Sequence, residues 1–296
     1  MGWQIIASSI AEASRRSNFG RLKCPLSIGA CAEEEMPIEL VDVYAWYAKR
    51  DYALKGVNAR ISNDTIVLGP NGSGKTTLMR TILGLVVSKS GRVLIDGVDV
   101  DSVRGATRLM ASNLREVMIN SKQPVRDVAK FILELVEGDY ERFIDIVARF
   151  AEGGVLKRNF AALSEGQKKI VLNALALASR AKYILLDEPF EGLDPARRVA
   201  MLNEIREASG VKIISTHVTW MLKNLPSWDL YLVVEGLVYG PLSVGYLGEL
   251  KISDKPVEDA VLTIRLRSGS HVYLSKTVGT PLSSLDTLDK LYEVIS

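Results

Sequence analysis

The sequence predicts an α/β fold. Between Ile38 and about Gly240, short apolar runs of strand length alternate with helical patterns, which is typical of this class. One of these runs leads into a glycine-rich loop that a helix follows, and another ends in two adjacent acids. These three observations place the chemistry of the chain within the α/β part.

The predicted elements follow one another along the chain. Residues 36–47 show strand-like alternation, with Ile38, Leu40, Asp42, Tyr44 and Trp46 on one side. The apolar runs that follow predict strands at 65–68, 92–95, 109–114, 183–186, 212–215 and 230–235. Helices are predicted at 131–136 and 140–150, within a small helical insertion. Near the end of the chain, we expect a hairpin around Ser268-Gly269-Ser270 and a closing helix at 285–295.

Three segments divide the chain. Residues 1–35 have no sustained periodicity, so we expect a poorly ordered extension. Alternatively, Met36 is the working start and these residues are non-native. Residues 36–240 form the main domain, with a helical subdomain at about 117–165. Residues 241–296 form a small C-terminal appendage.

Composition excludes several classes of function. The 37 lysines and arginines nearly balance the 35 aspartates and glutamates, so nucleic acid is not expected as a partner. Both cysteines, Cys24 and Cys31, lie in the first 35 residues, so the main domain has no cysteine-based metal site. No apolar run approaches the ~18–20 residues of a membrane span, so work at a membrane requires a partner that crosses it.

A phosphate-binding loop is the strongest motif. The strand at 65–68 leads into GPNGSGKTT, which matches G-x-x-x-x-G-K-[ST] between a strand and a helix. Its backbone N–H groups and helix N-terminus favour phosphate, Lys75 would reach the β- and γ-phosphates, and the Thr76 hydroxyl would hold Mg²⁺. The candidate binding residues are Gly69, Pro70, Asn71, Gly72, Ser73, Gly74, Lys75, Thr76 and Thr77. Alone, this loop fits a kinase, a GTPase or an ATPase.

Two acids end the strand at 183–186. Asp187 can bind Mg²⁺, directly or through water, and Glu188 can orient and polarise a water molecule for in-line attack. The sequence lacks the N-K-x-D motif that reads guanine, which makes a GTPase less favoured.

A second anion site is predicted at LSEGQKK, residues 163–169. Ser164 and Gly166 precede an apolar helix, whose first N–H groups have no partner within the helix. This site lies some ninety residues after the first, and a single nucleotide held by the first loop gives it no function.

The order of these motifs resembles that of the nucleotide-binding subunit of ATP-binding-cassette (ABC) transporters. LSEGQ is similar to the family signature, YILLDE to its second nucleotide motif, GLD at 192–194 to its D-loop, and STH, ending at His217, to its switch histidine. The resemblance covers about residues 38–240. It implies a P-loop NTPase cassette with a RecA-like core, an antiparallel β subdomain and a helical subdomain.

The resemblance also implies roles for residues. In this family two domains pair head to tail, so Ser164, Gly166 and Gln167 would bind the ATP held by the partner subunit. His217 would form a hydrogen bond at the γ-phosphate, and Asp194 would link the two sites. Tyr47, with Trp46 as the alternative, would stack on adenine.

Two positions depart from the family pattern. Glu165 stands where glycine is frequent, and we expect its carboxylate to point away from the triphosphate, which it would otherwise repel. Glu116 stands where a glutamine usually touches Mg²⁺ and the transmembrane partner; a glutamate can also be a ligand, so it is a candidate metal residue with Thr76 and Asp187.

The resulting hypothesis is an ATP-hydrolysing subunit that powers a separate transmembrane transporter through nucleotide-driven dimer closure. It implies ATP and Mg²⁺ as cofactors. The expected partners are a second ABC ATPase subunit, in a homo- or heterodimer, and integral membrane subunits at the inner, cytoplasmic face of the cell membrane. One alternative is a soluble ABC ATPase that assembles or remodels a protein complex. Another is a cassette that binds nucleotide without turnover, against which Glu188 and His217 argue.

Overall fold

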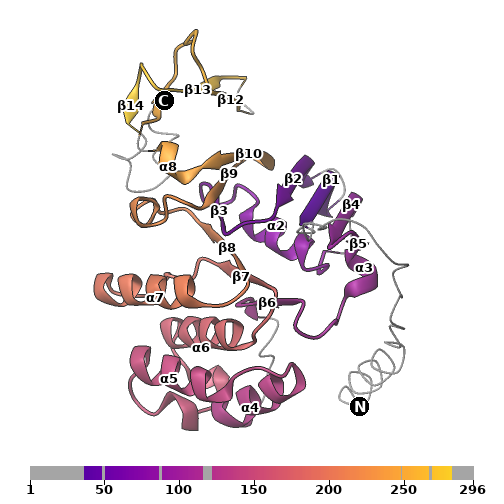
Figure 1. Ribbon diagram of the computed structural model, residues 1–296, viewed down its shortest axis with the longest axis vertical. Coiled ribbons are helices and arrows are strands. Elements are labelled where there is room, and N and C mark those ends of the chain that lie inside the picture. Colours follow the sequence, from indigo (N-terminus) through magenta and orange to yellow (C-terminus); the bar gives the residue numbers. More distant parts are fainter. Residues whose placement is uncertain are drawn as a thin grey trace, which may run out of the picture.

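A six-stranded sheet lies at the centre of the molecule (Figure 1). The computed structural model describes residues 37–48, 51–86, 89–115, 122–247, 249–266 and 269–281. The strand order is β10-β9-β3-β8-β7-β6, and every neighbouring pair is parallel except β9 and β10. The strands are β3 (Thr65–Leu68), β6 (Met110–Ser112), β7 (Tyr183–Asp187), β8 (Val211–Thr216), β9 (Asp229–Val234) and β10 (Leu237–Ser243). The α/β prediction is therefore confirmed, and each central strand predicted from the sequence is present.

Each face of this sheet supports its own apolar core, because successive strand side chains point to opposite faces. On β3, Val67 packs with Leu78 and Ile82 of helix α2 (Lys75–Ile82). Ile66 and Leu68 belong to the core on the other face. That second core includes helices α6 (Glu165–Ala178) and α7 (Pro195–Glu207).

An antiparallel sheet covers α2 on its other side. Its order is β2-β1-β4-β5, formed by β1 (Ile38–Ala48), β2 (Asp51–Ile61), β4 (Lys89–Ile95) and β5 (Val98–Asp99), with the short helix α3 (Val100–Val103) following. Buried Ile38, Leu54 and Val93 share one core with α2. The nucleotide loop therefore begins a helix that is held between two sheets.

The predicted alternation along β1 is wrong beyond Leu40. The buried residues are Ile38 and Leu40, and then Val43 and Ala45. The pairing with β2 shifts between Leu40 and Val43, where Asp42 adopts a left-handed φ of 49°. The Asp42 N–H donates to Asn58 Oδ1 at 3.0 Å. An extra residue at this bulge reverses which side chains face the core, and a strict two-residue period cannot reveal it.

The helical insertion lies at the end of the molecule opposite the C-terminal strands (Figure 1). It contains α4 (Val125–Leu135), α5 (Tyr140–Phe150) and the short 3₁₀ turns η2 (Val155–Lys157) and η3 (Phe160–Ala162). Helix α5 has the predicted bounds, whereas α4 begins six residues before the predicted 131–136 segment. Arg149 of α5 pairs with the buried Glu204 of α7, which ties the insertion to the central domain.

The C-terminal part is a small four-stranded sheet in the order β12-β13-β11-β14. The short helix α8 (Val244–Leu247) leads from β10 into this sheet, whose strands are β11 (Lys251–Ser253), β12 (Leu262–Arg265), β13 (His271–Ser275) and β14 (Thr280–Pro281). The short 3₁₀ turn η4 (Leu222–Asn224) lies earlier in the chain, before β9. The predicted hairpin is present as β12 and β13, with Gly269 at a φ of 87° between them. The predicted extension at 1–35 and the closing helix at 285–295 lie outside the described residues.

Within the described ranges, no helix combines the length and the apolar character that crossing a membrane requires.

Candidate active site

Three parallel strands end at one edge of the central sheet and carry the predicted site residues there. The loop at 69–74 follows β3, Asp187 and Glu188 stand at the end of β7, and His217 follows β8. Because β3 pairs with β8 and β8 with β7, these segments, far apart in sequence, are neighbours in space. Ligands in open α/β sheets bind at such carboxyl ends.

The glycine-rich loop is shaped to enclose an anion. Gly74 has a φ of 112°, and a Cβ there would lie 2.7 Å from the carbonyl oxygen of Ala53, so only glycine fits. Lys75, which is 5% exposed, donates from Nζ to the carbonyl oxygens of Gly69 and Pro70 at 2.8 and 3.0 Å. The buried Ser73 hydroxyl has no hydrogen-bond partner among the described residues, and a phosphate oxygen could supply one.

Thr76 and Asp187 place hard oxygen ligands side by side. The Thr76 hydroxyl donates to Asp187 Oδ2 at 2.8 Å, and the Ser215 hydroxyl donates to Asp187 Oδ1. In the described residues, no group of three or more His, Cys, Asp or Glu side chains could enclose a metal ion. A hydroxyl and one carboxylate fit Mg²⁺, because this ion takes few protein ligands and completes its shell with water and phosphate oxygens.

The Glu188 carboxylate is the point where the three strand ends meet. His217 Nδ1 lies 2.9 Å from its Oε1, Lys75 Nζ lies 3.4 Å from the same atom, and the Thr216 hydroxyl donates to Oε2 at 3.1 Å. The backbone of Glu188 has a left-handed φ of 45°, which costs of order 1 kcal/mol for a residue with a side chain. Surrounding contacts must therefore hold it in place.

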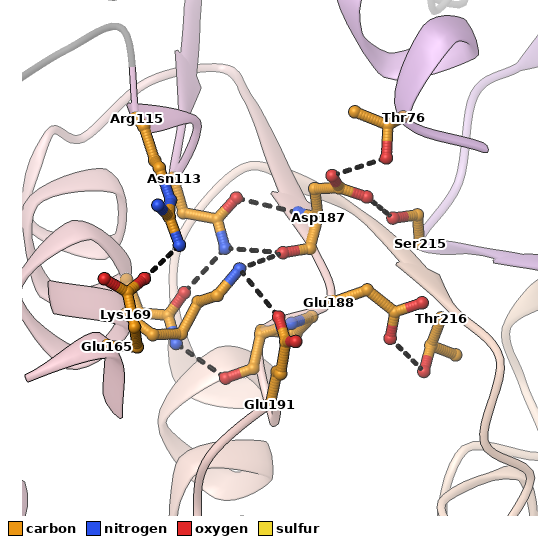
Figure 2. A network of polar contacts seen from close by, with 12 residues as sticks. Thr76, Asn113, Arg115, Glu165, Lys169, Asp187, Glu188, Glu191, Ser215 and Thr216 are labelled. Atoms are coloured by element: carbon orange, nitrogen blue, oxygen red, sulfur yellow. Dashed lines mark hydrogen bonds and ion pairs between the residues drawn. The ribbon is translucent and has the colours of Figure 1, made fainter. Parts of the chain in front are cut away.

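Two asparagines that the sequence reading missed hold the backbone at these acids, and Figure 2 labels one of them, Asn113. Asn113, at the end of β6, accepts the Asp187 N–H at 2.7 Å and donates to the Asp187 carbonyl at 3.1 Å. It also donates to Asn173 of α6 at 2.7 Å, and Asn173 donates to the Pro189 carbonyl at 2.8 Å. Asn113 is 2% exposed and Asn173 is fully buried. An asparagine within the apolar run of α6 was the available signal.

Lys169 is the third missed residue. Its Nζ donates to the Asp187 carbonyl at 2.9 Å and lies 4.0 Å from Glu191 Oε2 (Figure 2). Burial lowers the pKa of the Lys169 ammonium from its usual 10.5, while the carboxylates of Asp187, Glu191 and Glu188 oppose this shift. The sequence shows Lys169 only as the second lysine of LSEGQKK.

The predicted second anion site is a well-formed helix start. Ser164 Oγ accepts the Gln167 N–H at 3.3 Å, and Gln167 Oε1 accepts the Ser164 N–H at 3.2 Å, which is a capping box. A Cβ on Gly166 would lie 3.3 Å from the carbonyl oxygen of Gly192, so the signature segment and the D-loop approach closely within one chain.

Glu165 is engaged by cations of its own chain. Arg115 and Lys168 both pair with its carboxylate. The hydrogen bond from Lys168, together with Arg115, lowers the pKa of the Glu165 carboxyl. Its negative charge is therefore compensated where glycine is usual.

The remaining predicted site residues are Asp194, the aromatic pair Trp46 and Tyr47, and Glu116. Asp194 caps α7, where its Oδ1 accepts the Arg197 N–H at 3.0 Å. Trp46 packs edge to face on Tyr52 with ring centroids 5.5 Å apart, so packing within the β1–β2 hairpin accounts for its place. The backbone of Tyr47 belongs to β1, but its side chain and the whole of Glu116 lie outside the described residues.

The fold and this edge of the sheet define a P-loop nucleoside triphosphatase. A strand, a glycine-rich loop and a helix place the buried Lys75 at the sheet edge. The Thr76–Asp187 pair lies beside it, and Glu188 and His217 stand at the ends of the neighbouring strands.

Comparison with known proteins identifies the family. Residues 54–191 match the sequence model of ABC transporters. An ABC transporter ATP-binding protein of Pyrococcus horikoshii is 32% identical over 275 residues, covering 87% of this chain and 99% of that protein. An sn-glycerol-3-phosphate import ATP-binding protein of Rhizobium johnstonii is 30% identical over 262 residues, covering 86% and 71%. A crystal structure described as a cobalt transport ATP-binding protein is 32% identical with a TM-score of 0.78, covering 87% and 100%.

The chain belongs to the ABC transporter family of ATP-binding proteins. It is an ATPase, the nucleotide-hydrolysing subunit that powers a separate transmembrane transporter.

Proposed function

We propose that this chain acts as one half of a head-to-tail ATPase dimer, paired with a second copy or with a similar subunit. Each ATP would lie between the P-loop of one subunit and residues 164–167 of the other. Ser164 is the N-cap of α6, and a helix N-terminus favours an anion, which supports a phosphate supplied by a partner. The observation that supports ATP hydrolysis at each site is that Lys75 Nζ and His217 Nδ1 both approach Oε1 of Glu188.

The P-loop would hold the triphosphate. The backbone N–H groups at the start of α2 would face the phosphates, and the Ser73 hydroxyl would gain its missing partner there. Thr76 and Asp187 would hold Mg²⁺, which neutralises charge that develops on the phosphate oxygens during transfer. Tyr47 is the proposed adenine platform, and Glu116 the proposed contact to the ion and the membrane partner.

The same atoms suggest how ATP releases the general base. The Lys75 ammonium lies 3.4 Å from Oε1 of Glu188. A γ-phosphate carries more charge than a carboxylate and would become the partner of Lys75. Glu188 would then be free to accept a proton from the attacking water, while His217 turns to the γ-phosphate. Asp194, in the D-loop, would transmit the state of one site to the other.

A membrane-embedded partner would dock beside the helical insertion. An apolar hollow of about 420 Å³ lies there, lined in part by Leu83, Leu85, Met110, Ile132 and Leu175. Its lining comes from both the central domain and α4, so an inserted helix would sense their relative position. This partner would hold the subunit at the cytoplasmic face of the membrane.

The cargo is not specified by this site. The relatives named above include one for sn-glycerol-3-phosphate import and one for cobalt transport. One of these cargoes is a phosphate ester and the other is a metal. We therefore propose only that the partner is a transporter.

Substitution of the proposed base tests this function. Glu188→Gln should keep ATP binding and reduce turnover at least ~100-fold, because a positioned general base contributes about that much. It also removes a negative charge beside the γ-phosphate, so the closed dimer should persist. Gel filtration should show a dimer with ATP and a monomer without nucleotide. Unchanged turnover would exclude Glu188 as the base.

Mixing two lesions tests the head-to-tail pairing. Ser164→Arg should abolish the ATP-dependent dimer, and Lys75→Ala should lose ATP binding. A heterodimer of these two chains has one site with both lesions and one site with neither. ATP should therefore restore association in the mixture; if it does not, while Glu188→Gln alone dimerises, residues 164–167 do not act on the partner's nucleotide.

A further inference from the structure

The peptide group that joins Asp187 to Glu188 is held on both sides. Its carbonyl oxygen accepts from Lys169 Nζ at 2.9 Å and from Asn113 Nδ2 at 3.1 Å. Its N–H, that of Glu188, donates to the Ser215 carbonyl at 2.9 Å. These contacts fix the orientation of the peptide at the residue whose φ of 45° is unfavourable. The direction in which the Glu188 side chain leaves the backbone therefore depends on them.

Lys169 differs from the other groups of this clamp by its origin. Asn113 and Ser215 belong to strand ends of the central sheet, whereas Lys169 lies in α6, five residues after Ser164. Figure 2 shows its side chain extending from this helix toward the end of β7. Its side chain is only 17% exposed. The helix that begins with the signature thus contacts the acid pair of its own chain.

We propose that Lys169 is a positioning residue for hydrolysis, which holds the Asp187–Glu188 peptide and so ties each subunit's signature helix to the base of that same subunit. This inference rests on the head-to-tail dimer proposed above. Ser164 would then contact the ATP of the partner while Lys169, one turn further along the same helix, orients the base that acts on the subunit's own ATP. A shift of α6 on closure would be transmitted to both sites.

The placement of the ammonium favours this role over simple charge pairing. It donates to a backbone carbonyl, while its nearest paired carboxylate, Glu191, is 4.0 Å away and largely exposed. An ion pair with an exposed carboxylate contributes little to stability, so the pair with Glu191 does not explain why the Lys169 side chain is largely shielded from water. The hydrogen bond from Lys169 Nζ to the Asp187 carbonyl links the lysine to the backbone geometry of Glu188.

The first test compares two lysines whose side chains are less than one fifth exposed. Lys169→Met keeps the length of the side chain and removes its donors, and Lys212→Met is the control. Lys212 is buried; its ammonium donates to the carbonyl of Ala208 and pairs with Asp64, away from the site. We expect Lys169→Met to lower kcat by about tenfold or more while ATP affinity stays within about twofold, because misplacement of a reacting group affects the chemical step. Lys212→Met should keep its kcat, and a wild-type kcat for Lys169→Met would overturn the proposal.

The second test asks which of the two sites Lys169 serves. Heterodimers carrying two different affinity tags are purified, and wild type paired with Glu188→Gln sets the reference rate, with one base left. Lys169→Met opposite Glu188→Gln should be much slower than the reference, because each site then has a lesion. Lys169→Met and Glu188→Gln in one chain, opposite wild type, should match the reference. The reverse pattern, or slow turnover in both pairs, would overturn the proposal.

Ser164→Arg in the same two pairings separates this inference from the dimer on which it rests. In a head-to-tail dimer its pattern is the opposite of that for Lys169→Met, because Ser164 serves the partner's nucleotide. If Ser164→Arg instead gives the same pattern as Lys169→Met, the head-to-tail arrangement fails. If only Lys169→Met departs from expectation, the dimer stands and the role of Lys169 is wrong.

Discussion

Asn113 and Asn173 show how uncharged side chains can organise an acidic site. Between them they satisfy both backbone groups of Asp187 and the carbonyl of Pro189. Each amide offers both donors and an acceptor, so the pair leaves few of its own groups without partners. A buried polar pair of this kind is sensitive to loss of either member, because the remaining groups cannot reach water.

A double-mutant cycle on this pair tests that sensitivity. Asn113→Leu and Asn173→Leu should each lower the free energy of unfolding by about 1–3 kcal/mol, the usual penalty for leaving a buried polar group unpaired. The double variant should lose less than the sum, since the two share a hydrogen bond. Denaturant unfolding measures both quantities. Exposed Asn224→Leu is the control and should change stability by less than about 0.5 kcal/mol; additive losses in the double variant would contradict the coupling.

The sequence alone predicted those site residues that are neighbours along the chain. Lys75 and Thr76 are the first two residues of α2, and Asp187 and Glu188 stand at the end of β7, so the local pattern was enough. Asn113, Asn173 and Lys169 gain their meaning only when β6, α6 and β7 pack together. No local signal distinguishes such a lysine from the exposed lysines of other helices.

At the scale of elements, polar side chains determine where several helices begin. Asp139 caps α5, Ser164 caps α6 and Asp194 caps α7, each accepting a backbone N–H of the first turn. Asp139 also pairs with Arg180 at 2.8 Å, and thereby joins the start of α5 to the residues after α6.

Removal of the α5 cap gives a stability prediction. Asp139→Ala should lower the free energy of unfolding by about 1 kcal/mol, as caps of this type typically contribute. Asp145→Ala, an exposed position of the same helix without a capping role, is the control and should be nearly neutral. Thermal unfolding of the three chains compares them, and equal melting temperatures would show that the cap does not contribute.

The carboxylate of Asp139 should also make the free energy of unfolding depend on pH. The hydrogen bond from the Arg142 N–H, followed by Arg180, lowers the pKa of Asp139 below its usual 3.8. A carboxyl with a lowered pKa in the folded state stabilises the fold above its unfolded pKa, and that contribution is lost as the pH falls toward the folded value. The difference between wild type and Asp139→Ala should thus be constant near neutral pH and shrink below about pH 4.

The element predictions succeeded where burial follows a regular period. The central strands are buried on both faces and read as continuous apolar runs, and α5 has a clear helical pattern. Strand β1 failed at Asp42, because a bulge changes the phase without changing the composition. The first six residues of α4 were missed because Val125, Val128 and Ala129 are interrupted by charged residues, and a continuous apolar run begins only at Phe131.

At the scale of the whole molecule, the apolar hollow beside the helical insertion is a surface that this chain does not itself cover. Leu85 stands at its lining with 47% of its surface exposed, and Ile132 and Leu175 line it from two helices. Exposed apolar groups gathered around a hollow are typical of surfaces that another protein covers.

Placing a charge in the hollow tests the proposed docking. Leu85→Glu should weaken recovery of the chain with membranes of its host cell by about tenfold or more, because an unpaired charge in an apolar contact costs over ~1.4 kcal/mol. ATP hydrolysis in solution should remain. Val261→Glu adds the same charge at a position of similar exposure, 53%, in the C-terminal part and should bind membranes normally. Equal membrane recovery of both variants would place the docking surface elsewhere.

The capping box at Ser164 has a consequence for repeated cycles of closing and opening. A hydroxyl has two lone pairs and one proton, and the contact with the Gln167 N–H uses only a lone pair. The proton is left for an incoming phosphate, so recognition adds a bond without removing the one that starts the helix. The conformational entropy of ordering this helix end was lost during folding and need not be lost again at each association. The helix start is therefore a preorganised surface that should keep the same order whether the dimer is open or closed.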